Sequence, residues 1–326
     1  MGIYALAAIS DWHINLKCQS ELETTERKYM KKIKENIFSY YLTFVSILIV
    51  VLFLSILITL VYQSFPSIKQ FGMDFYTKDV WNPVSQEFGS LSFLVGTLIT
   101  SLLAILIAIP FSIMISIFLG EYFKEGIFSN ILKSMVELLA GIPSIVYGIW
   151  GLFVFVPFFR GIQMYLVQNE IMNIHPFGRG IFTASIILTV MIIPYAASIG
   201  RDVISMVPND LKEAGYSLGG TRFEVIKKII LPYCKSGIIA GILLALGRAL
   251  GETMAVTMVI GNRNVLPKTI MDPSSTLASV LANEFGEATN LLHLSSLVHL
   301  GLVLFLTTAI VNIAGKAIIN RGFRSG

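Results

Sequence analysis

Arg248 and Glu252 are two opposite charges in the middle of a largely apolar stretch, residues 236–262. If this stretch is one helix, the spacing of four residues puts both side chains on one face, about one turn apart. Charges at the centre of a bilayer are costly, so they persist only when they pair or line a polar path. Two interpretations therefore stand. The pair fixes helix packing, or Arg248 contacts an oxyanion through its rigid donor fork, with Glu252 as its internal counter-ion.

Four further residues are weaker candidates for the same path. The segment Gly141-Ile142-Pro143-Ser144 predicts a break in its span, because Pro143 removes a backbone hydrogen bond. Such a break either exposes polar backbone to a cavity or only kinks the helix. The candidate residues are Ser144, Tyr147, Thr253 and Thr257. Hydroxyl groups in membrane helices often bond their own backbone instead, so both interpretations stay open.

Residues 210–232 form a polar loop with a regular spacing of small, acidic and apolar residues. Its marked positions are Glu213, Ala214, Gly215, Gly219, Ile229, Leu231 and Pro232. Asp210 is a suitable cap for a short helix over residues 212–218, which Gly219 and Gly220 end. A second short helix is predicted over residues 221–230, ending at Pro232. Two such helices at a membrane surface make a compact knob that either contacts a partner or only tethers two spans.

The composition and the charge-free stretches predict the helices that must position these residues. The chain has 326 residues, of which 55% are hydrophobic and only 13% are charged, against about 25% charged in an ordinary soluble domain. Five stretches contain no charged residue, and each is long enough for one helical crossing of a bilayer, which takes about 20 residues. These stretches are residues 36–68, 88–120, 138–159, 180–200 and 288–315. Together with 236–262 they predict an all-α membrane protein with six transmembrane helices.

Basic residues are divided unevenly between the two sets of loops. With the N-terminus inside, the inner segments hold 17 Lys and Arg residues and the outer loops hold 6. Because basic residues favour the cytoplasmic side, both termini are predicted to be cytoplasmic. Residues 1–35 are then a cytoplasmic N-terminal segment, of which residues 1–29 are expected to be dispensable or to precede the true start. Residues 36–320 form the six-helix domain.

Other classes of protein fit the sequence poorly. The net charge of +4 follows the loop pattern and not a soluble basic face, so no nucleic acid is expected. Two cysteines and four histidines show no disulfide or metal-ligand spacing, so no metal site is expected. The spans supply no further acidic or histidine residues near Arg248 for a membrane hydrolase. No G-x-x-x-x-G-K-[ST] loop occurs, so any ATPase that drives this chain must be a separate polypeptide.

The spacing in the loop at 210–232 resembles the EAA loop of ABC importer permeases, whose coupling helices seat in a cytoplasmic ATPase. The one departure is Gly215, where the family usually has Ala; we expect no loss of function from it. Three further segments resemble the PstC family of phosphate importer permeases, and the resemblance covers nearly all of residues 37–320. These segments are residues 247–256 (GRALGETMAV), 136–154 and 81–101.

This resemblance implies a type I ABC importer permease (MetI-like) fold and a role in ATP-driven phosphate uptake. It associates Arg248 and Glu252 with phosphate passage. The implied partners are a PstA-like sister permease, a PstB-like ATPase dimer and a PstS-like extracytoplasmic phosphate-binding protein. The chain is expected to need no cofactor and to perform no bond-making chemistry, since ATP and Mg²⁺ would be bound by the partner ATPase.

Two alternatives keep the same class of protein. The chain resembles, less closely, the PstA sister family, and permeases for other oxyanions such as molybdate, sulfate or phosphonate share the general layout. A secondary transporter would need no ATPase and would leave the EAA spacing unexplained.

Overall fold

The computed structural model describes residues 38–124, 126–170 and 175–324, which are mostly helical. The predicted N-terminal segment 1–35 lies outside these residues. The chain divides into two units, one ending at Thr59 and one beginning at Leu60, and each is described by itself. In the first unit, the described residues 38–59 belong to one apolar helix, Phe38–Phe71, that continues into the second.

Six helices in the described part of the chain are long and apolar enough to cross a membrane, which confirms the predicted number of spans. They are Phe38–Phe71, Leu91–Tyr122, Ser144–Gln168, Ile181–Ser205, Arg222–Leu250 and Leu291–Ala317. The protein is thus a multi-pass membrane protein.

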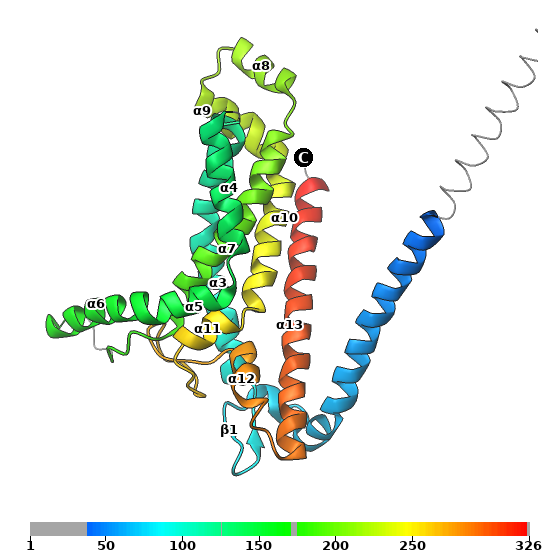
Figure 1. The fold of residues 1–326 in the computed structure, drawn as a ribbon, viewed down its shortest axis with the longest axis vertical. Coiled ribbons are helices and arrows are strands. Elements are labelled where there is room, and N and C mark those ends of the chain that lie inside the picture. The colour runs from blue at the N-terminus through cyan, green and yellow to red at the C-terminus, as the bar shows by residue number, and fades with distance from the viewer. Residues whose placement is uncertain (1–37, 125, 171–174, 325–326) are drawn as a thin grey trace, which may run out of the picture. The chain divides into compact units, whose positions relative to one another are not determined.

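The centre of the second unit is a bundle of four helices, drawn near vertical in Figure 1. These helices are α3 (Leu91–Ile117, continued by the π-helical turn η1, Phe118–Tyr122), α7 (Ile181–Ser205), α10 (Leu231–Leu250) and α13 (Leu291–Arg324). α3 packs along α7, and α10 packs against both. Small polar residues allow this close approach: Thr189 Oγ1 donates to the Ala104 carbonyl at 3.1 Å, and Ser185 Oγ donates to the Thr100 carbonyl at 3.1 Å.

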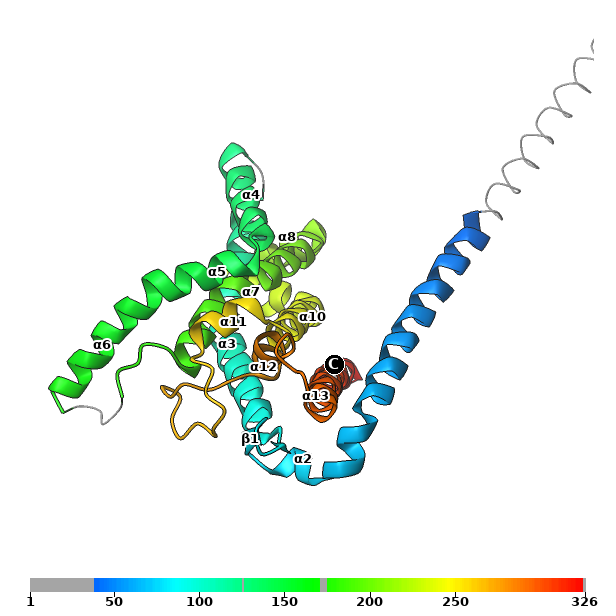
Figure 2. The ribbon, with the colours of Figure 1, turned by 60° about the horizontal axis from the view of Figure 1, so that its bottom comes forward.

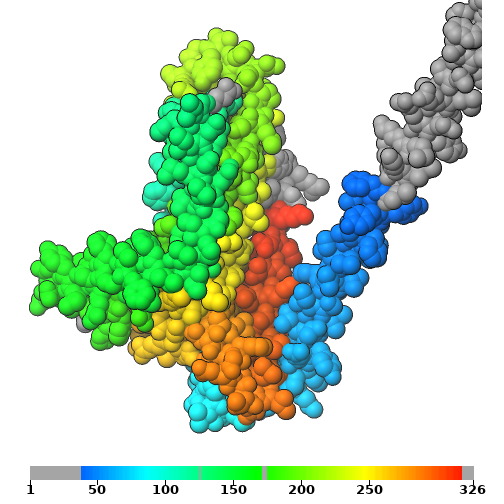
Figure 3. Space-filling view, viewed as in Figure 1, coloured from blue at the N-terminus to red at the C-terminus, as the bar shows by residue number. Residues whose placement is uncertain are grey.

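The third charge-free stretch does not form one straight helix. α4 (Ile127–Gly141) ends just before Pro143, and α5 (Ser144–Trp150) begins a new direction that η2 (Gly151–Phe155) and α6 (Val156–Gln168) continue. α4 and α5 both pack against α7, while α6 runs away from the bundle as a lateral arm in Figures 1 and 2, which also stands out in the space-filling view of Figure 3. The break predicted at Gly141–Ser144 is confirmed.

One end of the bundle carries a small aromatic layer. It contains α2 (Asp74–Thr77), the antiparallel strands β1 (Trp81–Asn82) and β2 (Glu87–Phe88), and α12 (Leu277–Glu284). Phe75, Trp81 and Phe88 are buried there against α13. Glu284 fixes the layer, because its carboxylate accepts hydrogen bonds from Trp81 Nε1 at 2.8 Å and bonds His293 Nε2 at 3.1 Å.

The opposite end carries the polar loop. α8 (Asn209–Ser217) lies there, followed by α9 (Arg222–Val225) and η3 (Ile226–Ile230). The second predicted helix does not end at Pro232: α9, η3 and α10 form one continuous helix from Arg222 to Leu250. Pro232 is tolerated because it follows a π-helical turn, where the regular pattern of backbone bonds is already interrupted.

Candidate functional site

α10 ends earlier than the apolar run predicts. Its last residue is Leu250; Gly251 is the C-cap, and a new helix, α11 (Met254–Val259), begins after Thr253. Arg248 is in the last turn of α10, and Glu252 lies in the break between the two helices. The prediction that both side chains share one continuous helical face is therefore wrong.

Arg248 lies at this break with hydrogen-bonding capacity unused. Its guanidinium carbon lies 4.3 Å from the ring centre of Tyr195 on α7, a distance typical of a cation–π contact. Its Nε atom is buried and has no hydrogen-bond partner among the described residues. The negative end of the α10 dipole also favours a cation in the last helical turn. Arg248 is thus held in place by Tyr195 and the helix end, while its buried Nε donor is left without a partner among the described residues.

Glu252 has a different role from the expected direct counter-ion. Its side chain is buried, and Oε1 accepts the backbone N–H of Ala255 at 3.2 Å, in the first turn of α11. Within the described parts of the chain, the ion pairs do not include one between Glu252 and Arg248. The carboxylate satisfies an N–H group that α11 itself leaves unbonded, so the direct ion pair is a wrong prediction.

The break before α5 lies close to Arg248. Because helix α4 stops at Gly141, its last carbonyls lack helical partners. The Tyr195 hydroxyl donates to the Ala140 carbonyl at 2.6 Å, and the Tyr147 hydroxyl donates to the Leu139 carbonyl at 2.8 Å. Tyr195, which the sequence analysis did not single out, thus contacts both Arg248 and the end of α4.

The other hydroxyl candidates also bond backbone groups. Thr253 Oγ1 donates to the Gly251 carbonyl at 3.2 Å, and Thr257 Oγ1 donates to the Thr253 carbonyl at 2.7 Å. Ser144 is the first residue of α5 and is half-buried. The hydroxyl hydrogens of both threonines and of Tyr147 are therefore used within the protein, and only their oxygen lone pairs remain.

Glycines bring α5 and α11 into direct contact. A Cβ atom at Gly148 would lie 2.7 Å from Met258 Sδ and 3.0 Å from Ala255 Cα. Since no side chain fits there, the two helices touch through their backbones. The start of α5, with Ser144 and Tyr147, is consequently held beside the break that carries Arg248 and Glu252. This arrangement offers a cation with a free donor at the junction of four helix ends, which suits transient contact with an oxyanion.

The loop at 210–232 has the predicted glycine turn, and its second helix has a capping box that was not predicted. Gly219 has φ +80°, a left-handed conformation that glycine adopts without strain, and it ends α8. Thr221 then caps α9 reciprocally with Glu224: Thr221 Oγ1 accepts the Glu224 N–H at 3.3 Å, and the Glu224 carboxylate accepts the Thr221 N–H at 3.1 Å. Asp210 is not the cap of α8; it lies in the first turn, after Pro208.

The predicted coupling residues divide into exposed and packed groups. Glu213 and Ala214 are exposed on α8, and Leu231 and Pro232 begin α10. Gly215 is buried, and an alanine methyl there would overlap the Cδ1 atom of Ile229. An alanine at this position would therefore require the end of the Ile229 side chain to shift.

A buried ion pair fixes the loop to the bundle. Lys212 Nζ bonds Glu121 in η1, and the side chains are only 6% and 9% exposed. Arg222 strengthens the junction, since its guanidinium carbon lies 3.9 Å from the ring centre of Tyr122 and its Nη2 donates to the Glu121 carbonyl at 3.3 Å. Neither residue was predicted from the sequence to form this pair. The only signal was that Glu121 directly follows a charge-free stretch.

Comparison with known proteins gives the family. The model of the family "Binding-protein-dependent transport system inner membrane component" matches residues 108–324. The phosphate transport system permease protein PstC of Pasteurella multocida is 44% identical over 94% of this chain and 97% of its own length. The chain belongs to this transport family, and within it to the PstC permeases. The PstC protein of Haemophilus influenzae is 43% identical over 91% of this chain and 97% of its own length.

A structural superposition gives independent support for the fold. The structure titled "Inward facing conformations of the MetNI methionine ABC transporter", in its SeMet soak crystal form, superposes with a TM-score of 0.51 at 18% identity. The superposition covers 72% of this chain and 94% of that chain. This chain thus has the MetI-like ABC permease fold, and the predicted fold class is confirmed.

Proposed function

We propose that this chain is the transmembrane permease subunit of an ATP-driven importer of inorganic phosphate. The observation that carries the proposal is the position of Arg248. This half-buried cation retains an unbonded donor at the junction of broken helices, in a PstC permease. The chain would form half of a translocation path and would perform no bond-making chemistry itself.

Arg248 would bind phosphate oxygens during passage. Its guanidinium offers several donors in a fixed plane, which matches the oxygens of a phosphate group. The Tyr195 ring holds that plane at one position. Glu252, four residues away and buried, contributes a negative charge that weakens anion binding and favours release. Weak, oriented binding is what a path needs, because a tightly held ion would not leave.

The continuous helix from Arg222 to Leu250 would connect this site to the loop. Arg222 and Arg248 are 26 residues apart in that helix, about 39 Å at 1.5 Å per residue. A partner that moves the loop would therefore tilt the helix that carries Arg248. The loop also presents apolar side chains to a partner: Leu218 and Phe223 are 90% and 68% exposed. We assign that contact to a PstB-like ATPase dimer, which would bind ATP and Mg²⁺.

The remaining partners follow from the same proposal. A PstA-like sister permease would supply the other half of the path. A PstS-like extracytoplasmic protein would deliver phosphate to the end of the bundle that carries the aromatic layer. Both termini and the loop at 210–232 would lie on the cytoplasmic side of the cytoplasmic membrane of a prokaryote, in agreement with the distribution of basic residues.

Transport by the reconstituted four-component system tests the proposal. Proteoliposomes that contain this chain with its three partners should accumulate radiolabelled phosphate when ATP is supplied, and excess molybdate or sulfate should not compete. The Arg248→Gln variant should lose uptake yet still co-purify with the ATPase, and Lys235→Gln, at an exposed cation on the same helix, is the matched control.

Three outcomes would count against the proposal. Competition by molybdate would move the assignment to another oxyanion. Failure of Arg248→Gln to assemble would favour the structural interpretation of this residue. Normal phosphate uptake by an assembled Arg248→Gln complex would remove Arg248 from the path.

A further inference from the structure

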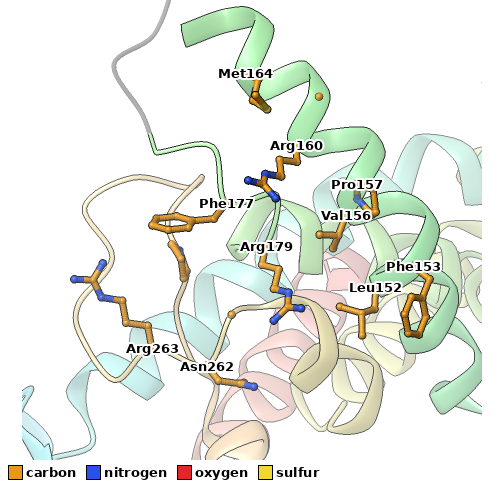
Figure 4. Close-up of a pocket in the computed structure, with 13 residues that line it drawn as sticks. Leu152, Phe153, Val156, Pro157, Arg160, Met164, Phe177, Arg179, Asn262 and Arg263 are labelled. Carbon is orange, nitrogen blue, oxygen red and sulfur yellow. The ribbon is translucent and has the colours of Figure 1, made fainter.

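A second group of arginines lines a cavity away from Arg248. The cavity has a volume of about 1150 Å³ and lies between η2 and the start of α6, the residues that precede α7, and the loop after α11. Three cations, Arg160, Arg179 and Arg263, are among its lining residues, and the described lining contains no carboxylate. Figure 4 shows Arg160 on α6 and Arg179 on the adjoining segment, with their side chains extending in different directions, whereas Arg263 stands on the outlying loop and points away.

The backbone beside Arg179 contacts α6 at Arg160. Gly178 has φ +72°, and a Cβ atom there would lie 2.8 Å from Arg160 Cβ, so the segment that carries Arg179 touches α6 directly. The Gly178 N–H donates to the buried Gln163 Oε1 at 2.8 Å, and Thr183 Oγ1 donates to the Gly178 carbonyl at 2.6 Å. These contacts fix the backbone segment that carries Arg179 against the part of α6 that carries Arg160.

Neither guanidinium is neutralised by the protein. In the ranges that the structure describes, Arg160 and Arg179 make no ion pair. The nearby Asp272 is occupied, since its Oδ2 accepts the backbone N–H groups of Lys268 and Thr269, both at 2.9 Å. Glu170 is ten residues beyond Arg160 near the end of α6, about 15 Å away along a helix. Two exposed cations at one cavity, with no carboxylate in its described lining, make the cavity positive and so favour an anion.

We propose that Arg160 and Arg179 form a second oxyanion site, which takes inorganic phosphate before it reaches Arg248; this inference rests on the proposed function. α11 connects the two places: the break with Arg248 and Glu252 precedes it, and Gly261, which lines the cavity, follows it. A helix of six residues spans about 9 Å. Phosphate leaving this cavity would therefore have a short path along the contact of α5 with α11.

Direct binding of radiolabelled inorganic phosphate tests this site. The probe is added to the assembled permease and ATPase complex in maltoside detergent, without the extracytoplasmic binding protein, and bound phosphate is measured by equilibrium dialysis. In an Arg248→Gln complex, one phosphate should still bind. Adding Arg160→Gln or Arg179→Gln to this complex should weaken phosphate binding about tenfold. A lysine in place of either arginine should weaken phosphate binding less than glutamine does, because it keeps the charge but lacks the planar donor fork. Lys268→Gln removes an exposed cation outside the cavity and should change it less than twofold.

Each contrary outcome overturns the inference. Unchanged phosphate binding in Arg160→Gln and Arg179→Gln would exclude the site. Retention of phosphatidylglycerol with no binding of inorganic phosphate would make it a lipid contact. A variant that binds phosphate normally but needs more of the binding protein for uptake would make it a docking surface for acidic side chains. Failure of the proposed function is a separate result, because wild-type complexes would then show no ATP-driven phosphate uptake whatever these arginines bind.

Discussion

The buried ion pair between Lys212 and Glu121 predicts that α8 is destabilised when one of the two charges is removed. We consider Lys212→Met, which keeps an unbranched side chain of nearly the same length but removes its charge. Glu121 would then be a buried carboxylate without its cation, since its side chain is only 9% exposed. Removing one partner of a buried pair costs about 3–5 kcal/mol. The pair lies at the end of the bundle, so we expect the lower value.

The expected effect is local to α8. A loss of about 3 kcal/mol corresponds to roughly a hundredfold rise in the opening of that helix. Hydrogen exchange of the amides of residues 209–217 in the purified protein measures this opening directly. The matched control is Lys228→Met, which removes the other lysine–glutamate pair of the same loop. That pair is exposed, with side chains 70% and 43% accessible, so its loss should cost about 1 kcal/mol or less.

The double variant Lys212→Met/Glu121→Gln tests the physical reason. It removes both charges, so no unpaired charge remains buried, and exchange of the α8 amides should return most of the way toward wild type. Exchange in Lys212→Met that matches wild type would refute the reasoning. So would a double variant as unstable as the single one, because the effect would then come from packing and not from charge.

Three further predictions concern other parts of the molecule. Tyr195→Phe keeps the ring over Arg248 but leaves the Ala140 carbonyl without its donor, so thermal unfolding should show a loss of about 1–3 kcal/mol while phosphate uptake persists; unchanged stability would contradict that hydrogen bond. Gly219→Ala puts a side chain at φ +80° and should cost about 1 kcal/mol and reduce the ATPase activity stimulated by transport, with membrane insertion unchanged; full stimulation would argue against the role of this turn. Burial would raise the pKa of Asp272, but hydrogen bonds from Thr269 and Lys268 outweigh it and hold the pKa below its ordinary value of 3.8. The ionised Asp272 carboxylate therefore stabilises the loop above about pH 3.8, and this stabilisation is lost as the pH falls below that value. Proteolysis within residues 261–275 should accelerate between pH 5 and pH 3, about the ordinary pKa of an aspartate, but not in Asp272→Asn.

Local sequence signals were sufficient for much of the architecture. Apolar runs without charge predict the spans, because backbone groups in lipid can be satisfied within a helix and so need no distant partner. Pro143 predicts the break before α5, since its ring removes a bond whatever surrounds it. Gly219 ends α8 for a reason that is equally local: its left-handed backbone conformation.

Other elements depended on contacts that the sequence does not record. The end of α10 at Leu250 was not predicted, because Gly247 to Val256 contains no proline and was interpreted as part of one continuous helix. In the structure α11 turns to pack on Gly148, and Glu252 bonds the new helix start instead of pairing with Arg248. Helix propensity could not reveal this, since the contact with α5 outweighs the preference for continuing the helix.

The amino-acid sequence alone determined the class of this protein, its six spans and the identity of its costly charges. Those properties depend on composition and on neighbours a few residues away. The tertiary structure alone decided which charges meet: Lys212 with Glu121, Arg248 with Tyr195, and Arg160 beside Arg179. Electrostatic and cation–π interactions depend on distance in space and on burial, and a folded chain sets both by packing together segments that the sequence separates.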